Sequence, residues 1–191
     1  DEKILCSWNG LMMFAMAEAY RVSGEPRFLE SSRRTADFLL ETLWRKSDAL
    51  LLHSYKDGQA RHQGYLEDYS GLLSGLVSIY ESCFEDKPLK TAISIADIML
   101  EEFYDATEAT FYFTGKSHEK LLTRPKEIHD GALPSSQGKA VEALLRLGRI
   151  LRSDKYLRVA SDTIAAVETQ MRQTPSAFAQ MYLNVDFMSR G

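Results

Sequence analysis

The sequence has few of the residues that build a metal centre or a disulfide framework. Cys6 and Cys83 are its only cysteines, and two cysteines so far apart make neither a zinc motif nor a convincing disulfide framework. The four histidines show no ligand spacing such as His-x-x-x-His. We therefore expect no metal, and no other cofactor is expected.

Long apolar runs and blocks of one charge are also missing. The apolar runs are short and interrupted, so no segment is expected to span a membrane. The net charge is -4 without a basic block, which gives no reason to expect a nucleic-acid partner. No charged-then-apolar leader opens the chain, so a cytoplasmic location is the expectation, although the abrupt start resembles a cut inside a longer protein.

Helical periodicity dominates what is present. With 45% hydrophobic and 26% charged residues, the chain is expected to form a single globular domain over residues 1–191. Apolar residues recur at helical spacing in three pairs of segments, which predict helical hairpins over about 7–43, 69–103 and 136–171. Ser7 is a good candidate for the cap of the first helix.

Two longer excursions separate the hairpins. The apolar run at 50–55 precedes an Asp-Gly pair, which predicts a β-hairpin, and the aromatic run at 109–114 predicts one strand of another. The excursions always follow a second helix, so they are expected on one rim together with the N-termini of the first helices. The predicted fold is all-α, a partial (α/α) toroid of consecutive hairpins with short β-hairpin insertions.

Three ordered motifs resemble signatures of a known family. They read DEKILCSWNGLM at residues 1–12, GYLEDY at 64–69 and DGALPS at 130–135. Together they are similar to the spermatogenesis-associated protein 20 family, whose members are thioredoxin-domain proteins. The resemblance implies a thioredoxin-like domain followed by an (α/α)6 toroid of the six-hairpin glycosidase and N-acylglucosamine 2-epimerase type. This chain resembles about half of that toroid, and it departs from the family at Gln137, where members usually have Asn.

Carboxylates and one histidine are the candidate catalytic groups. Glu67 or Asp68 is a candidate general acid or base, as carboxylates are in glycoside hydrolysis. Because adjacent residues at a helix start point in different directions, the better second carboxylate is Asp130. His129 is a candidate base for proton abstraction in an epimerase. The alternative is structural: Asp68 caps a helix, Glu67 is solvated, and residues 129–130 form a loop turn.

The candidate binding groups lie at the same rim. Trp8 and Asn9 are predicted to offer an aromatic platform and an amide to sugar hydroxyls, and Tyr69 extends this edge. Ser135, which ends the third motif, and Gln137, two positions after it, are further candidates. The alternative is that an aromatic residue at a helix start packs as a hydrophobic staple.

Two classes of function follow. The first is carbohydrate binding or processing at the loop rim, either by hydrolysis, which needs two carboxylates, or by epimerisation, which needs a histidine. The second is a non-catalytic helical scaffold that binds a protein partner. Exposed hairpin faces also predict a possible homodimer.

Overall fold

The fold is built from consecutive antiparallel helical hairpins, as predicted. The computed structural model describes residues 2–119 and 123–190. The hairpins are α1 (Cys6–Ser23) with α2 (Pro26–Thr42), α3 (Leu66–Cys83) with α4 (Asp86–Phe103), and α5 (Ser136–Leu151) with α6 (Asp154–Gln173), followed by a 3-10 turn (Pro175–Ala177) and α7 (Ala179–Ser189). No helix within the described residues is both long enough and apolar enough to cross a lipid bilayer.

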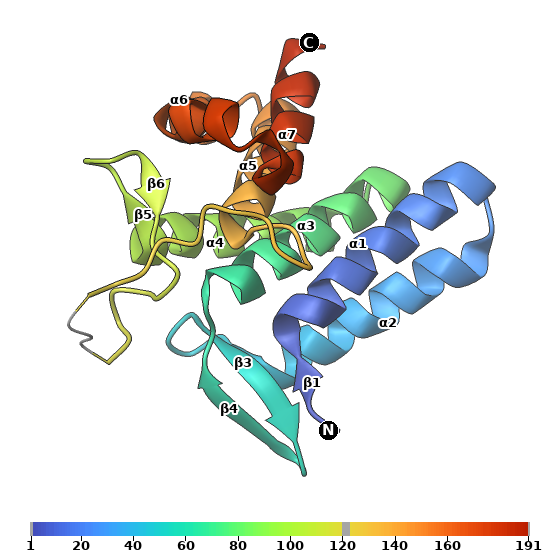
Figure 1. Cartoon of the computed structure of the whole chain (residues 1–191). Helices are drawn as coiled ribbons and strands as arrows, with labels where there is room; N and C mark the ends of the chain where they lie inside the picture. The colour runs from blue at the N-terminus through green and yellow to red at the C-terminus, as the bar shows by residue number, and fades with distance from the viewer. Residues whose placement is uncertain (1, 120–122, 191) are drawn as a thin grey trace.

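The first helix of each hairpin lies in an inner layer and the second helix in an outer layer. In Figure 1, α3 lies between α1 and α5, and α2 and α4 flank this inner layer. The middle helix α3 is buried almost throughout, from Leu66 to Ile79. The outer helices bury only one stripe, such as Leu29, Ala36 and Leu39 of α2. This amphipathic pattern is why the periodicity could be read from the sequence.

Glycines allow the inner helices to approach closely. A Cβ atom added to Gly10 of α1 would lie 2.4 Å from the carbonyl carbon of Gly71 in α3. A Cβ atom on Gly75, one turn further along α3, would lie 2.8 Å from the side chain of Met13. The N-terminal halves of α1 and α3 therefore pack closely, with backbone against backbone at Gly10 and Gly71, which brings their N-termini to the same rim.

The first excursion forms the β-hairpin that the Asp-Gly pair predicts. β3 (Leu50–Lys56) pairs antiparallel with β4 (Gln59–Gln63). Asp57 and Gly58 join them with φ values of 52° and 76°, the left-handed conformation of a type I′ turn. Two short strands that the sequence did not suggest, β1 (Ile4–Leu5) and β2 (Trp44–Arg45), also pair with β3.

The second excursion is mostly irregular. β5 (Tyr104–Asp105) pairs with β6 (Thr110–Phe111), so the predicted short hairpin is confirmed, although its strands have two residues each. After this hairpin the chain crosses the start of α3 and reaches α5 (Figure 1). Both excursions lie at the end of the molecule where α3 and α5 begin, which places loop side chains around the inner-helix N-termini.

Candidate functional site

A cleft of about 240 Å³ opens where the three inner helices begin. It is lined by first-turn residues of all three helices and by the segment that precedes α5. The lining residues are Ser7 and Leu11 of α1, Glu67, Ser70 and Gly71 of α3, Ser135, Ser136 and Lys139 of α5, and Glu127, His129, Gly131, Leu133 and Pro134. The three motifs of the sequence therefore meet at one place.

Glu67 is the predicted catalytic carboxylate that reaches this cleft. It lies in the first turn of α3, half-buried. Burial raises the pKa of Glu67 above its ordinary value, and the negative charge of Asp68 raises it further. A carboxyl group in such a place stays protonated to higher pH than an exposed one, which suits a general acid.

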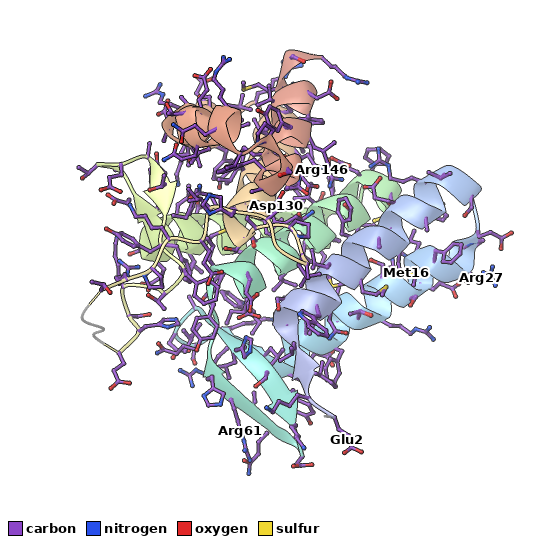
Figure 2. The ribbon with its side chains drawn as sticks, viewed as in Figure 1. Glu2, Met16, Arg27, Arg61, Asp130 and Arg146 are labelled. Carbon is purple, nitrogen blue, oxygen red and sulfur yellow. The ribbon has the colours of Figure 1, made fainter. Side chains whose placement is uncertain are left out.

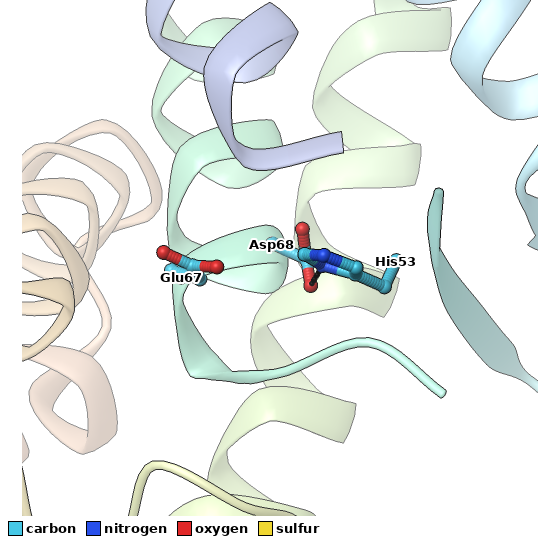
Figure 3. Close-up of side chains that lie close together, drawn as sticks. All are labelled: His53, Glu67 and Asp68. Carbon is cyan, nitrogen blue, oxygen red and sulfur yellow. Dashed lines mark hydrogen bonds and ion pairs between the residues drawn. The ribbon is translucent and has the colours of Figure 1, made fainter. Parts of the chain in front are cut away.

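Asp68 lies behind the cleft and has a structural position. Its side chain is fully buried, and Figure 3 shows it between Glu67 and His53. Oδ1 accepts a hydrogen bond of 2.9 Å from the backbone N–H of Ser7, and Oδ2 accepts one of 2.9 Å from that of Tyr65. The carboxylate thus caps the starts of α1 and α3 together, and its catalytic role stays a prediction.

His53 on β3 completes the surroundings of Asp68. Its Nδ1 lies 2.9 Å from Oδ2 of Asp68, and this hydrogen bond raises the pKa of His53. Among the residues that the structure describes, His53, Glu67 and Asp68 bring three possible metal-ligand atoms within 4.8 Å of one another. A cation there would have to compete with the hydrogen bonds that Asp68 already accepts. Sequence reasoning missed His53, which no helical or ligand spacing marks.

Asp130 holds the loop before α5 in place. Its Oδ1 accepts a hydrogen bond of 2.8 Å from the backbone N–H of Ser135, and its Oδ2 accepts one of 2.8 Å from that of Gln180 in α7. Figure 2 shows Asp130 beside the start of α5. The neighbouring His129 lines the cleft instead. His129 and Asp130 therefore have different environments although they are adjacent in the sequence. The carboxylate of this segment that lines the cleft is Glu127, which sequence reasoning missed.

The aromatic residues predicted as a sugar platform lie outside the cleft. Trp8 is 61% exposed, and the Asn9 amide donates to the backbone carbonyl of Leu5, one turn earlier in the chain. Tyr69 is buried, where its hydroxyl accepts from the backbone N–H of Leu51 and burial raises its pKa to about 12. Asn9 and Tyr69 thus have hydrogen-bonding uses of their own, and a role in sugar binding stays a prediction for all three residues.

Serines at the starts of α1 and α5 contribute hydroxyl groups to the cleft. Ser135 caps α5 by accepting from the backbone N–H of Gly138, while Gln137 is buried with its Oε1 accepting from the N–H of Phe111. Ser7 and Ser136 both line the cleft and are more than nine-tenths buried. Neither of their hydroxyl oxygens has a hydrogen-bond partner within residues 2–119 and 123–190. The floor of the cleft therefore carries polar groups that a ligand could satisfy.

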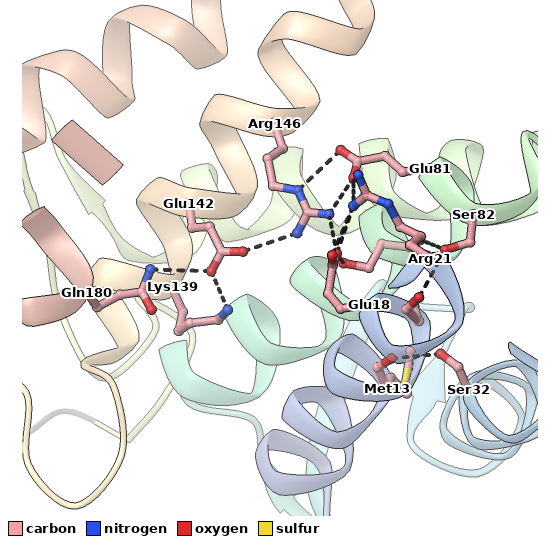
Figure 4. Close-up of polar contacts among 12 residues, drawn as sticks. Met13, Glu18, Arg21, Ser32, Glu81, Ser82, Lys139, Glu142, Arg146 and Gln180 are labelled. Atoms are coloured by element: carbon pink, nitrogen blue, oxygen red, sulfur yellow. Dashed lines mark hydrogen bonds and ion pairs between the residues drawn. The ribbon is translucent and has the colours of Figure 1, made fainter. Parts of the chain in front are cut away.

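A charged network joins the inner helices beyond the cleft. Arg146 of α5 is nearly buried and contacts Glu18 of α1, Glu81 of α3 and Glu142 of its own helix (Figure 4). These residues line a second hollow of about 460 Å³, and Lys139 lines both hollows. The Lys139 ammonium pairs with Glu142 and lies 4.0 Å from the centre of the Phe14 ring.

Comparison with known sequences gives relatives but no matching family model. The chain is 26% identical over 187 residues to an uncharacterised protein of Caenorhabditis elegans, and 28% identical over 191 residues to human spermatogenesis-associated protein 20. Each match includes 95% of this chain. The chain spans about a quarter of the length of the curated relatives it matches, 25% and 24% respectively.

Two solved structures with a similar fold are a cellobiose 2-epimerase and a family 76 α-mannanase. Cellobiose 2-epimerase from Bacillus thermoamylovorans matches 88% of this chain and 46% of its own length with a TM-score of 0.72 and 12% identity. A family 76 α-mannanase from Bacteroides thetaiotaomicron matches 88% of this chain and 45% of its own length with a TM-score of 0.72 and 16% identity. At such identities the likeness shows the fold alone. The predicted resemblance is confirmed: the chain is similar in sequence to spermatogenesis-associated protein 20 and has the fold of part of an (α/α)6 toroid.

Proposed function

We propose that the cleft binds a carbohydrate and that Glu67 acts there as a general acid or base. The observation that carries this proposal is the position of Glu67: it is half-buried in a cleft that the first turns of all three inner helices line. Hydroxyl-bearing side chains of Ser7 and Ser136 lie at the same place. Polar groups converging in a concave site are what small-molecule binding needs.

The structural neighbours support the choice of ligand. An α-1,6-mannanase from Salegentibacter sp., with a TM-score of 0.70 and 11% identity, was solved in complex with α-1,6-mannotriose. It matches 86% of this chain and 47% of its own length. That protein is a variant with two consecutive aspartates replaced, and it is inactive. Glu67 and Asp68 are also consecutive acidic residues, so adjacency does not speak against an active-site role for one of them.

Both predicted reactions remain compatible with the cleft. Hydrolysis would use the protonated Glu67 to assist a leaving glycosidic oxygen, because burial and the Asp68 charge favour its neutral form. Epimerisation would use His129, which lines the same cleft, to move a proton beside a carbonyl group. Asp68 and Asp130 would serve either reaction by fixing the backbone around these residues.

Thermal melting in the presence of sugars tests the proposal. We expect α-1,6-mannotriose or cellobiose to raise the melting temperature, because a ligand at a hundred times its dissociation constant adds about 2.7 kcal/mol. The Glu67→Gln variant should lose most of this shift. The matched control is Glu30→Gln, which changes an exposed carboxylate on α2. Equal shifts in all three proteins, or no shift with either sugar, would contradict the proposal.

A second function, a scaffold for a protein partner, has one observation in its favour. Trp8 and Met12 lie four residues apart on α1 and are 61% and 51% exposed, so they form an apolar strip on that helix. A partner or a second copy of the chain could cover them. If a second copy does so, Trp8→Ser with Met12→Ser should change the sedimentation coefficient of the protein, while Glu67→Gln should not.

A further inference from the structure

An extended segment before α5 alternates between two environments. At residues 124–130 the even-numbered side chains are partly buried and the odd-numbered ones are exposed. The segment runs over the N-terminal ends of α3 and α5 in Figure 1. A period of two is what an extended chain gives when one face rests on the protein and the other faces outward.

Hydrogen bonds hold the inward face of this segment at both of its ends. The Arg124 guanidinium donates to the backbone carbonyls of Thr114 and Glu102. The Lys126 ammonium donates to Asp105 over 2.7 Å and also to Glu108 and Thr110. At the far end, Asp130 accepts from Ser135 and Gln180, and its own N–H donates over 2.7 Å to the carbonyl of Ala177.

The outward face presents Glu127 and His129 to the cleft. Both line it together with Glu67, which comes from a different element, α3. After burial and Asp68, the charge of Glu127 is a further contribution that raises the pKa of Glu67, so the two carboxyl groups interact electrostatically. Glu67 is half-buried and Glu127 is exposed. When two carboxyl groups lie in different surroundings, one can stay protonated and act as an acid while the other is ionised and acts as a base.

We propose, building on the proposed function above, that Glu127 is the second carboxylate of a glycoside hydrolase site and acts as the base opposite Glu67. The Glu67 carboxyl donates its proton to the glycosidic oxygen as the bond from that oxygen to the anomeric carbon breaks. A water oxygen bonds to the anomeric carbon while its proton passes to the Glu127 carboxylate. Glu67 ends with one proton fewer and Glu127 with one more, and solvent restores both.

With Glu127 as the base, Asp130 is not the second catalytic carboxylate that the sequence predicted. Asp130 is a positioning residue, because its carboxylate holds the segment that carries Glu127 and His129. His129 then lies beside the base and contacts the ring of Phe178 at 5.0 Å between ring centres. The base is thus carried by an anchored segment and the acid by a buried helix, which fixes both relative to the cleft.

Hydrolysis of two substrates distinguishes the role of the acid from the role of the base. We expect the wild type to cleave α-1,6-mannotriose and 2,4-dinitrophenyl α-mannoside. Glu67→Gln should lose about 10²-fold or more on mannotriose but little on the dinitrophenyl substrate, whose leaving group needs no proton. Glu127→Gln should lose both activities, and added azide should restore cleavage of the dinitrophenyl substrate. The matched control Glu101→Gln, an exposed carboxylate of α4, should behave as the wild type.

The outcome also separates this inference from the proposal on which it rests. If mannotriose or cellobiose stabilises the wild type but neither sugar nor its dinitrophenyl glycoside is cleaved, the carboxylate pair is wrong and the carbohydrate site stands. If Glu127→Gln cleaves both substrates within twofold of the wild type, Glu127 is not the base. If no sugar stabilises the protein and none is cleaved, both proposals fail.

Discussion

Asp68 on α3 binds the backbone of Ser7 on α1, 61 residues earlier in the chain, with 2.9 Å between Oδ1 and the nitrogen. Its other oxygen accepts from the N–H of Tyr65 at the start of α3. One buried carboxylate therefore supplies the N-terminal ends of two inner helices with an acceptor. This side chain therefore fixes two elements of the cleft rim to each other.

Replacing Asp68 should reveal that structural use. Asp68→Ala leaves the buried N–H of Ser7 and the part-buried N–H of Tyr65 without an acceptor, and an unsatisfied buried group costs about 1–3 kcal/mol. We expect the free energy of unfolding to fall by about 3 kcal/mol, measured by urea denaturation. Glu67→Gln is the control and should change it by less than about 0.5 kcal/mol. Equal stability of the two variants would contradict the capping role of Asp68.

The pair of His53 and Asp68 should make stability depend on pH. The hydrogen bond to Asp68 raises the folded pKa of His53 above its ordinary 6.5, so this stabilisation is complete below about pH 6.5 and is lost as pH rises through the folded pKa. The raised pKa of Glu67 also makes stability fall with rising pH, but that loss begins above about pH 4.5, the ordinary value of this carboxyl group. We expect the free energy of unfolding to fall as the pH rises above about 6.5. A His53→Asn variant should show a flatter profile over this window, and a profile as steep as that of the wild type would contradict the assignment.

The contact between α1 and α3 should not tolerate a methyl group at Gly10. The added Cβ would meet the backbone of Gly71 at 2.4 Å, and a backbone cannot move aside as a flexible side chain can. Gly10→Ala should therefore destabilise the protein by about 3 kcal/mol or more in a urea titration. Gly131→Ala is the matched control, because a Cβ atom added to Gly131 would have no other atom within 4 Å in the part of the chain that the structure describes. Wild-type stability of Gly10→Ala would show that the helices pack less closely.

Arg146 should contribute more to stability than Arg21, which belongs to the same charged network. Arg146→Met takes from Glu18 and Glu81 their most buried cation and leaves Glu142 paired with Lys139, and losing one partner of a buried ion pair costs about 3–5 kcal/mol. We expect the low end of that range, because Glu18 and Glu81 are 33% and 21% exposed. Arg21→Met, whose arginine is 42% exposed, should cost about 1 kcal/mol or less. Similar costs for the two variants, from calorimetric melting, would argue against this ranking.

The fold followed from local patterns because each hairpin carries its own periodicity. The apolar spacing of 7–43, 69–103 and 136–171 predicts α1 to α6 to within about three residues at each end. The Asp57-Gly58 turn also followed from two residues alone. The start of α1 did not follow from the local sequence. Ser7 looks like a cap in the sequence, yet it lies inside the first turn because the capping group comes from Asp68, a distant residue.

The site could be predicted only in part for the same reason. Glu67 and His129 were singled out, and the structure places both at the cleft. Asp68 and Asp130 carry the same functional group, but backbone N–H groups from other parts of the chain occupy their oxygens. Which of two adjacent acidic residues faces a cleft depends on contacts across the chain. Periodicity does not encode them.

Backbone chemical-shift mapping with α-1,6-mannotriose tests the central claim most directly. We expect the largest changes at the amides of Ser7, Gly71 and Ser136, which lie near the N-terminal ends of the three inner helices and line the cleft. Ala36 and Thr91 report on a separate hollow between α2 and α4 and should stay unchanged. Changes confined to that outer hollow, or no changes at millimolar sugar, would contradict a carbohydrate site at Glu67.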